Sequence, residues 1–210
     1  MLAKLMSLFL LGLVRLLTGA QARWHGCPPK AEQRIYFANH QSHADLVMIW
    51  AALPQELRSI TRPIAAKDYW TSSPFKKWIT SAVFNAIYVD RTAKKDPVTG
   101  ASESDPLEPL VEALTSGDSI ILFPEGTRGH AEEPQPFKAG LYNLAMKFPE
   151  VVLVPAWINN VQRVMPKGEV VPVPILCSVT FGAPVKVEPG EERRAFLDRA
   201  RLAVIALRDV

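Results

Sequence analysis

The sequence predicts a single α/β domain in which a central β-sheet is flanked by helices. Short apolar segments rich in β-branched and aromatic residues alternate with segments of helical period, as strands and helices do in this class. The chain has 210 residues, which is the length of one domain and enough for a substantial core. Hydrophobic residues make up 48% of the chain and charged residues 21%, and this composition excludes a disordered protein.

Charge and cysteine content exclude several other classes of protein. The formal net charge of +3 is too small to indicate a nucleic-acid-binding protein, so we expect no nucleic-acid partner. Cys27 and Cys177 are the two cysteines, and they lie far apart in the sequence. The sequence therefore predicts neither a disulfide framework nor a cysteine metal site.

The N-terminal segment, residues 1–33, differs from the rest of the chain. Its uncharged, leucine-rich run at residues 5–14 is shorter than the ~20 apolar residues of a membrane-spanning helix. Polar residues three and four positions apart mark one helical face, with Leu11 as the exception: Lys4, Ser7, Arg15 and Thr18. The opposite face is apolar and holds Leu2, Leu5, Met6, Phe9, Leu13, Leu16 and Leu17. Such an amphipathic helix is expected to lie in a membrane interface with its apolar side in the lipid.

The charge of this segment supports the interfacial interpretation, and two other interpretations remain open. Residues 1–34 carry five basic residues and one acid, an excess that anionic lipid headgroups would attract. The leucine-rich run followed by Ala20-Gln21-Ala22 also resembles a signal peptide with a small-residue cleavage site, although Arg15 interrupts the run. An ordinary buried core helix is the third interpretation.

Residues 34–210 are expected to form the domain itself. Strands are predicted at 34–38, 63–66, 86–89, 119–123, 151–154 and 175–181, where β-forming residues gather. Helices are predicted at 45–53, 74–83, 107–114, 140–148 and 191–208. The first of these helices follows a start signal at Ser42 and Asp45. Residues 151–154 are apolar without a break, as at the centre of a covered sheet, and 92–106 have the composition of a loop.

A first block of polar residues, 39–45, follows the strand at 34–38 and offers a general base. If His40 lies in the turn and Asp45 in the first helical turn, their side chains can meet. Asp45 would then orient one ring nitrogen, and the other nitrogen would accept a proton. The chain has no Gly-x-Ser-x-Gly pattern for a serine nucleophile, so we expect the activated hydroxyl to belong to a substrate.

The same block admits a metal-site interpretation. His40, His43 and Asp45 form His-x-x-His-x-Asp, a pattern that zinc can bind. A metallo-hydrolase would need further ligands, and the remaining histidines, His25 and His130, lie in no cluster. We therefore predict no metal site.

A second block, Phe123-Pro124-Glu125-Gly126-Thr127-Arg128, follows the strand at 119–123 and suits a phosphate. Gly126 lets the backbone approach a ligand closely, and Arg128 supplies a planar fork of donors that matches phosphate oxygens. Glu125 is expected to orient donors rather than contact the anion. Arg91, at the end of another predicted strand, is a second positive group, and a plain surface turn remains the alternative.

The ordered set of blocks resembles the glycerolipid acyltransferase family, whose best-known bacterial members are lysophosphatidic acid acyltransferases. The matching blocks are 39–45, 87–91, 123–128 and 151–155, with support from 66–67, 137–140 and 179–182. The resemblance covers residues 34–185 and implies a glycerolipid-acyltransferase-like domain. The chain departs from the family pattern in three places. Phe84-Asn85-Ala86 stands where a glycine is common shortly before the strand, Gly129 stands where serine is usual, and the loop 92–106 is expected beside the acceptor pocket.

The resemblance implies transfer of a fatty acyl group from acyl-CoA or acyl carrier protein to the free hydroxyl of lysophosphatidic acid, giving phosphatidic acid. His40 would be the general base and Asp45 its orienting partner. The implied acceptor-binding residues are Arg91, Glu125, Gly126, Thr127 and Arg128, with Lys67 holding an anionic substrate or the oxyanion. No metal or bound cofactor is implied.

The implied partners are membrane lipids, a lysophospholipid acceptor and the acyl donor. The implied location is the cytoplasmic face of the inner membrane, with the protein peripheral or monotopic. Three alternatives remain from the residues themselves. They are the same chemistry on another lysolipid or lyso-aminolipid, hydrolysis of a thioester or ester, and non-catalytic lipid binding.

Overall fold

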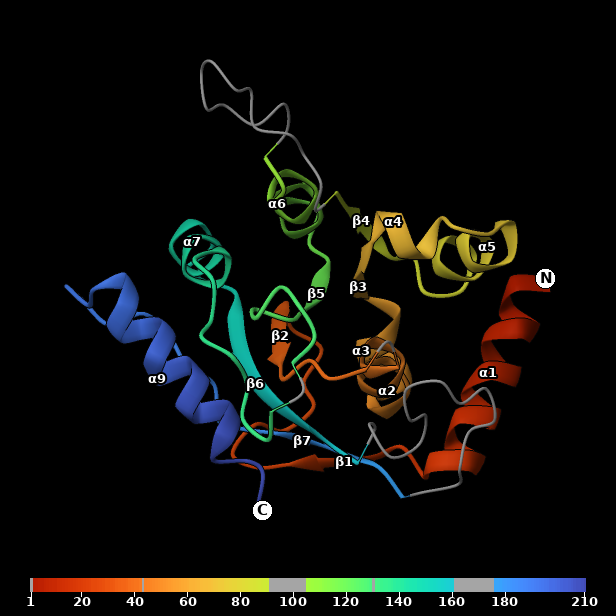
Figure 1. Ribbon diagram of the computed structural model, residues 1–210, viewed down its shortest axis with the longest axis horizontal. Coiled ribbons are helices and arrows are strands. Elements are labelled where there is room, and N and C mark those ends of the chain that lie inside the picture. Colours follow the sequence, from red (N-terminus) through yellow and green to blue (C-terminus); the bar gives the residue numbers. More distant parts are fainter. Residues whose placement is uncertain (1, 43, 91–104, 130, 161–175) are drawn as a thin grey trace.

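The computed structural model describes residues 2–42, 44–90, 105–129, 131–160 and 176–210 (Figure 1). Within these ranges the strands are β1 (Gln21–Trp24), β2 (Arg34–Ala38), β3 (Thr61–Ala66), β4 (Ile87–Val89), β5 (Ser119–Leu122), β6 (Val152–Asn159) and β7 (Ser178–Phe181). The helices are α1 (Leu2–Thr18), α2 (Asp45–Ala52), α3 (Gln55–Ser59), α4 (Lys67–Trp70), α5 (Pro74–Ala82), α6 (Glu108–Thr115), α7 (Gly140–Lys147) and α9 (Arg193–Ile205). The predicted α/β class is confirmed.

The strands form one mixed sheet in the order β1-β7-β6-β2-β5-β3-β4. From β6 to β4 all neighbours are parallel, whereas β7 runs antiparallel to β6, and β1 runs parallel to β7. Because β2, β5, β3 and β4 are parallel neighbours, their carboxyl ends lie at one edge of the sheet. The four segments that follow these ends include both polar blocks, and this edge is where α/β proteins usually place their sites.

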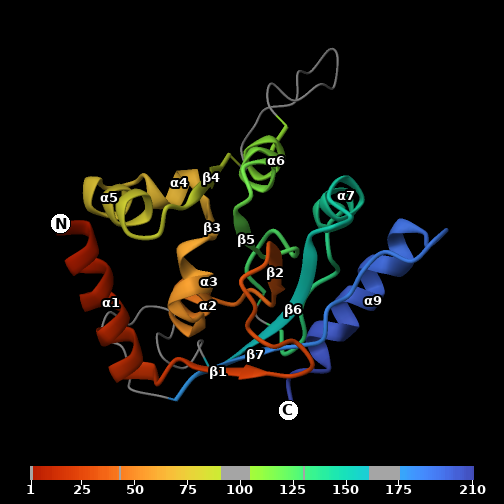
Figure 2. The same cartoon turned by 180° about the vertical axis from the view of Figure 1, so that it is seen from behind.

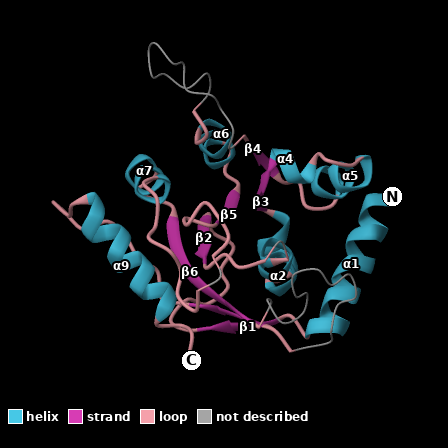
Figure 3. Ribbon diagram, in the orientation of Figure 1, coloured by secondary structure: helices cyan, strands magenta, loops and turns pink. Residues whose placement is uncertain are grey.

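Helices cover the two faces of the sheet and bury two apolar clusters (Figure 3). Successive residues of β2 point to opposite faces. Tyr36 packs in the cluster that includes α2 and Leu11 of α1, and Ile35 and Phe37 pack in the cluster under α6, α7 and α9. Helices α1 and α9 lie at opposite ends of the molecule (Figure 2). Since β2 is covered on both faces, its end is held firmly, and it carries the first polar block.

The largest differences from the sequence prediction among the strands concern β1 and β6, whereas β3 begins two residues earlier than predicted and β7 begins at Ser178 rather than at 175. Residues 1–33 are expected to be a helical segment, but the helix ends at Thr18, and β1 pairs with β7 at the edge of the sheet. Its residues alternate between exposed and half-buried, so they form no apolar run that a sequence pattern would detect. The interior strand predicted at 151–154 instead continues through Pro155 to Asn159. A proline normally argues against a central strand because it donates no backbone hydrogen bond.

Helix α1 packs on the domain through the part of its predicted polar face that holds Leu11 and Thr18, while Lys4 and Arg15 on this face are exposed. Leu11 and Thr18 are buried, and Arg15 donates a hydrogen bond to the carbonyl oxygen of Ala51 at 3.3 Å. Leu11 interrupts the polar pattern because it packs into the core on this side, together with the partly buried Leu10 and Val14.

The opposite face of α1 is exposed, so the interpretation as an ordinary buried core helix is wrong. Its large side chains Leu2, Leu5, Phe9 and Leu16 are 56–82% exposed. In Ala20-Gln21-Ala22, the cleavage site of the signal-peptide alternative, Gln21 and Ala22 are the first two residues of β1. Across the described ranges, we find no helix with both the length and the hydropathy needed to span a bilayer.

Candidate active site

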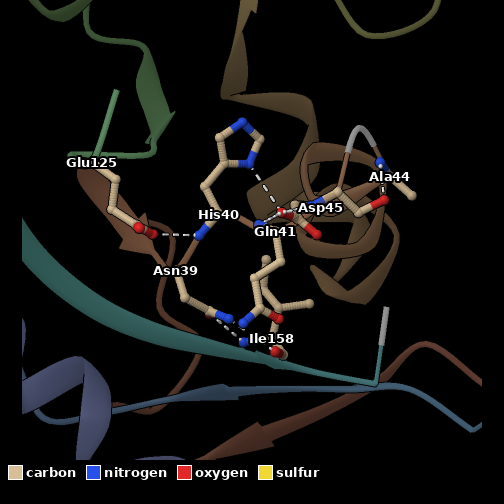
Figure 4. Close-up of polar contacts among 8 residues, drawn as sticks. Asn39, His40, Gln41, Ala44, Asp45, Glu125 and Ile158 are labelled. Atoms are coloured by element: carbon tan, nitrogen blue, oxygen red, sulfur yellow. Dashed lines mark hydrogen bonds and ion pairs between the residues drawn. The ribbon is translucent and has the colours of Figure 1, made fainter. Parts of the chain in front are cut away.

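The site is centred on His40 and Asp45, which the structure brings into contact as predicted. His40 Nδ1 lies 2.9 Å from Asp45 Oδ2. The same oxygen accepts hydrogen bonds from the backbone N–H groups of Gln41 at 2.6 Å and Ser42 at 2.8 Å (Figure 4). A carboxylate oxygen that accepts these bonds favours the tautomer with hydrogen on Nδ1. The other ring nitrogen points away from Asp45 and is left to accept a proton (Figure 4).

The start of α2 differs from the predicted helix cap. Helix α2 begins at Asp45, and no side chain caps it. Ser42 Oγ instead accepts a hydrogen bond from the backbone N–H of Ala44 at 3.2 Å. The Asp45 carboxylate reaches back over the loop rather than into its own helix, which is how it meets His40.

The second block fixes His40 from the other side. Glu125 Oε1 accepts a hydrogen bond from the backbone N–H of His40 at 2.7 Å, and Gly129 donates one to the His40 carbonyl at 2.8 Å. The ring of Phe123 stacks on the imidazole with a centroid distance of 4.3 Å and an interplanar angle of 15°. The adjacent ends of β2 and β5 make these contacts, so the two blocks form one unit.

Glu125 joins parts of the backbone and is 2% exposed. Its second oxygen, Oε2, accepts a hydrogen bond from the backbone N–H of Gln135 at 2.8 Å. Burial raises the pKa of this carboxyl above its ordinary value, although the two backbone bonds act in the opposite direction. The donors that Glu125 orients are therefore backbone amides of His40 and Gln135.

Asn39 anchors the end of β2, a role that the sequence analysis missed. Its side-chain amide accepts a hydrogen bond from the Ile158 N–H at 2.8 Å and donates one to the Ile158 carbonyl at 3.1 Å (Figure 4). Ile158 lies in the part of β6 beyond Pro155, 119 residues away in sequence. No sequence signal links these two residues, because the contact depends on β6 lying beside β2.

A cavity opens beside the imidazole and contains about 370 Å³ of space, part of it open to solvent. Its lining combines apolar and polar side chains and comprises His40, Leu46, Ile64, Ala66, Tyr69, Trp70, Phe123 and Arg128. A concave site in which apolar side chains stand beside a few polar groups is typical of binding sites for organic ligands. The cavity brings a ring nitrogen of His40 and the guanidinium of Arg128 together with apolar side chains that can contact a hydrocarbon chain.

The other predicted site residues are distributed as follows. Arg128 lines the cavity, while Thr127 is exposed and Gly126 has a φ of +70°, which favours glycine. Lys67 is exposed at the start of α4, next to the cavity-lining Ala66 but not in the lining itself. Arg91 lies outside the described residues.

The metal interpretation gains no support from the described part of the chain, where no three histidine, cysteine or acidic residues cluster in a way that could hold a metal ion. His43, one of the three predicted zinc ligands, is not among these residues. Asp45 Oδ2 is already engaged with His40 and two backbone amides.

Residues 25–159 match the sequence model of the family described as Acyltransferase. The chain belongs to this family. It is 29% identical over 188 residues to human 1-acyl-sn-glycerol-3-phosphate acyltransferase alpha, covering 87% of this chain and 61% of that protein. It is 28% identical over 171 residues to 1-acyl-sn-glycerol-3-phosphate acyltransferase from Cocos nucifera, covering 76% and 48% of the two chains. The chain thus spans about 60% or less of the length of these curated relatives.

A solved structure supports the fold of this acyltransferase-family chain. The crystal structure of the 1-acyl-sn-glycerophosphate (LPA) acyltransferase PlsC from Thermotoga maritima matches it with a TM-score of 0.66. The match covers 98% of this chain and 79% of that chain at 21% sequence identity. At this identity the likeness concerns the fold.

Two of the departures from the acyltransferase pattern have structural explanations, and the third, the loop 92–106, lies mostly outside the described residues. Asn85 has a φ of +49°, a left-handed conformation that asparagine tolerates better than most residues other than glycine. It therefore fits a place near which the family commonly has glycine. At Gly129 an added Cβ would lie 3.3 Å from Glu125 Oε2, so glycine leaves room for the carboxylate.

Proposed function

We propose that the protein is an O-acyltransferase that moves a fatty acyl group from an acyl thioester to the free hydroxyl of lysophosphatidic acid. The observation that carries this proposal is the pair formed by His40 Nδ1 and Asp45 Oδ2 at 2.9 Å, at the wall of a cavity that Arg128 also lines. A fixed base beside a guanidinium and an apolar surface fits an acceptor with a hydroxyl, a phosphate and an acyl chain. The product is phosphatidic acid.

The proposed mechanism begins when the free ring nitrogen of His40 takes the proton of the acceptor hydroxyl. The alkoxide oxygen attacks the thioester carbonyl carbon, and a tetrahedral intermediate forms. The intermediate collapses, the C–S bond breaks, and His40 returns its proton to the leaving thiolate. Asp45 stabilises the imidazolium between these two transfers. The scheme uses no metal and no bound cofactor.

The second block has two functions in this proposal. Arg128 and Thr127, together with Arg91, bind the acceptor phosphate, and Gly126 lets the backbone come close to it. Glu125 shapes the pocket through the backbone amides of His40 and Gln135. Lys67, beside the cavity, attracts an anionic substrate or stabilises the oxyanion. The assignment of lysophosphatidic acid as acceptor draws support from the names of the relatives.

We further propose that the exposed face of α1 lies in the lipid of a membrane. An amphipathic helix whose polar side packs on its own domain presents its apolar side outward. Lys4 and Arg15 on the same helix attract anionic headgroups. The protein would bind the cytoplasmic face of the inner membrane peripherally or as a monotopic protein, and there it would meet its lipid acceptor.

An acyl-transfer assay read by mass spectrometry tests this function. Purified protein receives acyl-CoA or acyl carrier protein thioester with a panel of lysolipids in mixed micelles. His40→Ala is the test variant, and His25→Ala, which changes an exposed histidine at the end of β1, is the matched control. We expect phosphatidic acid from the wild type and from His25→Ala, and a loss of about 10²–10⁴-fold in kcat for His40→Ala.

Other products would change the proposal in defined ways. Acylation of a different lysolipid alone would keep the reaction and replace the acceptor. Free fatty acid as the sole product would indicate hydrolysis. A His40→Ala variant with near wild-type rates would sink the general-base mechanism.

A further inference from the structure

Lys138 lies across the turn of the second block, and no role has been assigned to it so far. Its backbone N–H donates a hydrogen bond to the Pro124 carbonyl at 2.9 Å, which fixes the lysine beside this turn. Its side chain then covers Gly126. A Cβ added at Gly126 would lie 2.6 Å from Lys138 Nζ and 3.0 Å from both Cδ and Cε. Because Gly126 has no side chain, there is room for the side chain of Lys138 over the turn.

The ammonium group of Lys138 has no anionic partner among the residues that the structure describes. Glu125, the acid next to Gly126, is occupied, because its two oxygens accept the backbone N–H groups of His40 and Gln135. The lysine is exposed, so its three N–H donors are accessible from outside the protein.

The position of Lys138 brings it to the same turn as Arg128. Gly126 is two residues before Arg128, which lines the cavity with His40. The guanidinium of Arg128 and an ammonium held over Gly126, two residues earlier, suit an anion with several oxygens. Arginine matches such an anion with a planar fork, and lysine adds a compact point charge.

We propose that Lys138 binds the phosphate of the lipid acceptor together with Arg128. This inference rests on the proposed function and adds to it a cation from a different segment, residues 137–140. It also gives Gly126 a second purpose beyond its positive φ, because any side chain there would displace the lysine.

The test variant is Lys138→Met, and the control variant is Lys147→Ala. Lys138→Met keeps an unbranched apolar stem over Gly126 and removes only the charge, so packing and binding are separated. Lys147→Ala removes another exposed lysine, at the end of α7. Lysophosphatidic acid and the monoacylglycerol with the same acyl chain serve as acceptors. The donor is the acyl thioester of N-acetylcysteamine, which carries no phosphate.

For Lys138→Met we expect a KM for lysophosphatidic acid that is about tenfold higher, the size of one charge-assisted hydrogen bond, with kcat within about twofold. The kinetics with monoacylglycerol should stay unchanged. Lys147→Ala should behave as the wild type with both acceptors. Gly126→Ala should raise the KM for lysophosphatidic acid in the same direction.

Three results would overturn the inference. Two are an unchanged KM for lysophosphatidic acid and an equal rise for both acceptors. The third, from a parallel assay with acyl-CoA as donor, is a KM that rises for acyl-CoA but not for the acceptor, which would assign Lys138 to the phosphates of the donor. Calorimetric titration with sn-glycerol 3-phosphate keeps the test decisive if the wild type forms no phosphatidic acid. In that case the acyl-transfer function fails, yet weaker binding by Lys138→Met alone would still support the phosphate contact, and equal binding would refute it.

Discussion

The two sides of the candidate site differ in how firmly they are held. His40 contacts Asp45 through its ring nitrogen, Phe123 through its ring face, and Glu125 and Gly129 through its backbone. Arg128, which also lines the cavity, is exposed. The difference teaches where precision is needed, since proton transfer requires a fixed geometry, whereas an exposed guanidinium can adjust to a substrate that arrives from outside.

The largest effect is expected when the negative charge of Asp45, which contacts His40, is removed. Asp45→Asn keeps the size of the side chain but removes the anion that orients Nδ1–H and stabilises the imidazolium. We expect kcat to fall about 10³-fold with little change in KM. Steady-state kinetics would show this, with Asp118→Asn at a half-exposed surface ion pair as the control. A loss of less than threefold would mean that Asp45 does not assist His40.

The second effect concerns stability and is expected when Asn39, which anchors the end of β2, is changed. Asn39→Ala leaves the buried N–H and carbonyl of Ile158 without their side-chain partner. We expect the free energy of unfolding to fall by about 2–4 kcal/mol, since each unsatisfied buried group costs about 1–3 kcal/mol. Denaturant unfolding would measure it, beside Asn143→Ala on the exposed side of α7. Equal stability of the two variants would argue against the anchor.

A change at the exposed Arg128 should alter the KM for the acceptor rather than kcat. Arg128→Ala is expected to raise the KM for lysophosphatidic acid about 10-fold or more while kcat stays within about threefold, because uniform phosphate binding is lost. Kinetics with the phosphorylated acceptor and with monoacylglycerol would show a loss of preference for phosphate. A fall in kcat at unchanged KM would place Arg128 with the fixed side.

The exposed apolar face of α1 can be compared with an exposed residue of α9 in membrane binding. Leu16 is 82% exposed, and Leu16→Glu should weaken binding to anionic vesicles by roughly tenfold, since burying one leucine contributes about 1.5–3 kcal/mol. Co-sedimentation would measure this, with Leu202→Glu on α9, 59% exposed, as the control. Equal losses for both variants would contradict a specific membrane face on α1.

The smallest effect concerns pH. Burial raises the pKa of Glu125 in the folded protein above its ordinary value of 4.5. The folded state therefore holds this proton more tightly than the unfolded state, and the contribution of Glu125 to stability should decrease as pH rises from about 4.5 through its raised pKa. Unfolding free energies measured across this window should show a smaller decrease for Glu125→Gln than for the wild type. Parallel curves would show that Glu125 contributes no such dependence.

Local patterns in the sequence were sufficient for most elements and for the centre of the site. The β-forming residues 34–38 and 119–123 correspond to β2 and β5, and the pairing of His40 with Asp45 needed only a turn followed by a helix start. The amphipathic period of α1 was also readable, including the exception at Leu11. These features depend on residues close together in the chain.

Tertiary structure decided the features that join distant segments. The order of the strands places β5 beside β2, so that Glu125 meets the backbone of His40. The extension of β6 past Pro155 brings Ile158 to Asn39, and pairing with β7 makes a strand of Gln21–Trp24, a segment whose alternation is too short to predict one. The side of α1 that packs on the domain was likewise settled by its contacts with α2. Each of these depends on which surfaces are buried together, a property of the whole chain that no local period encodes.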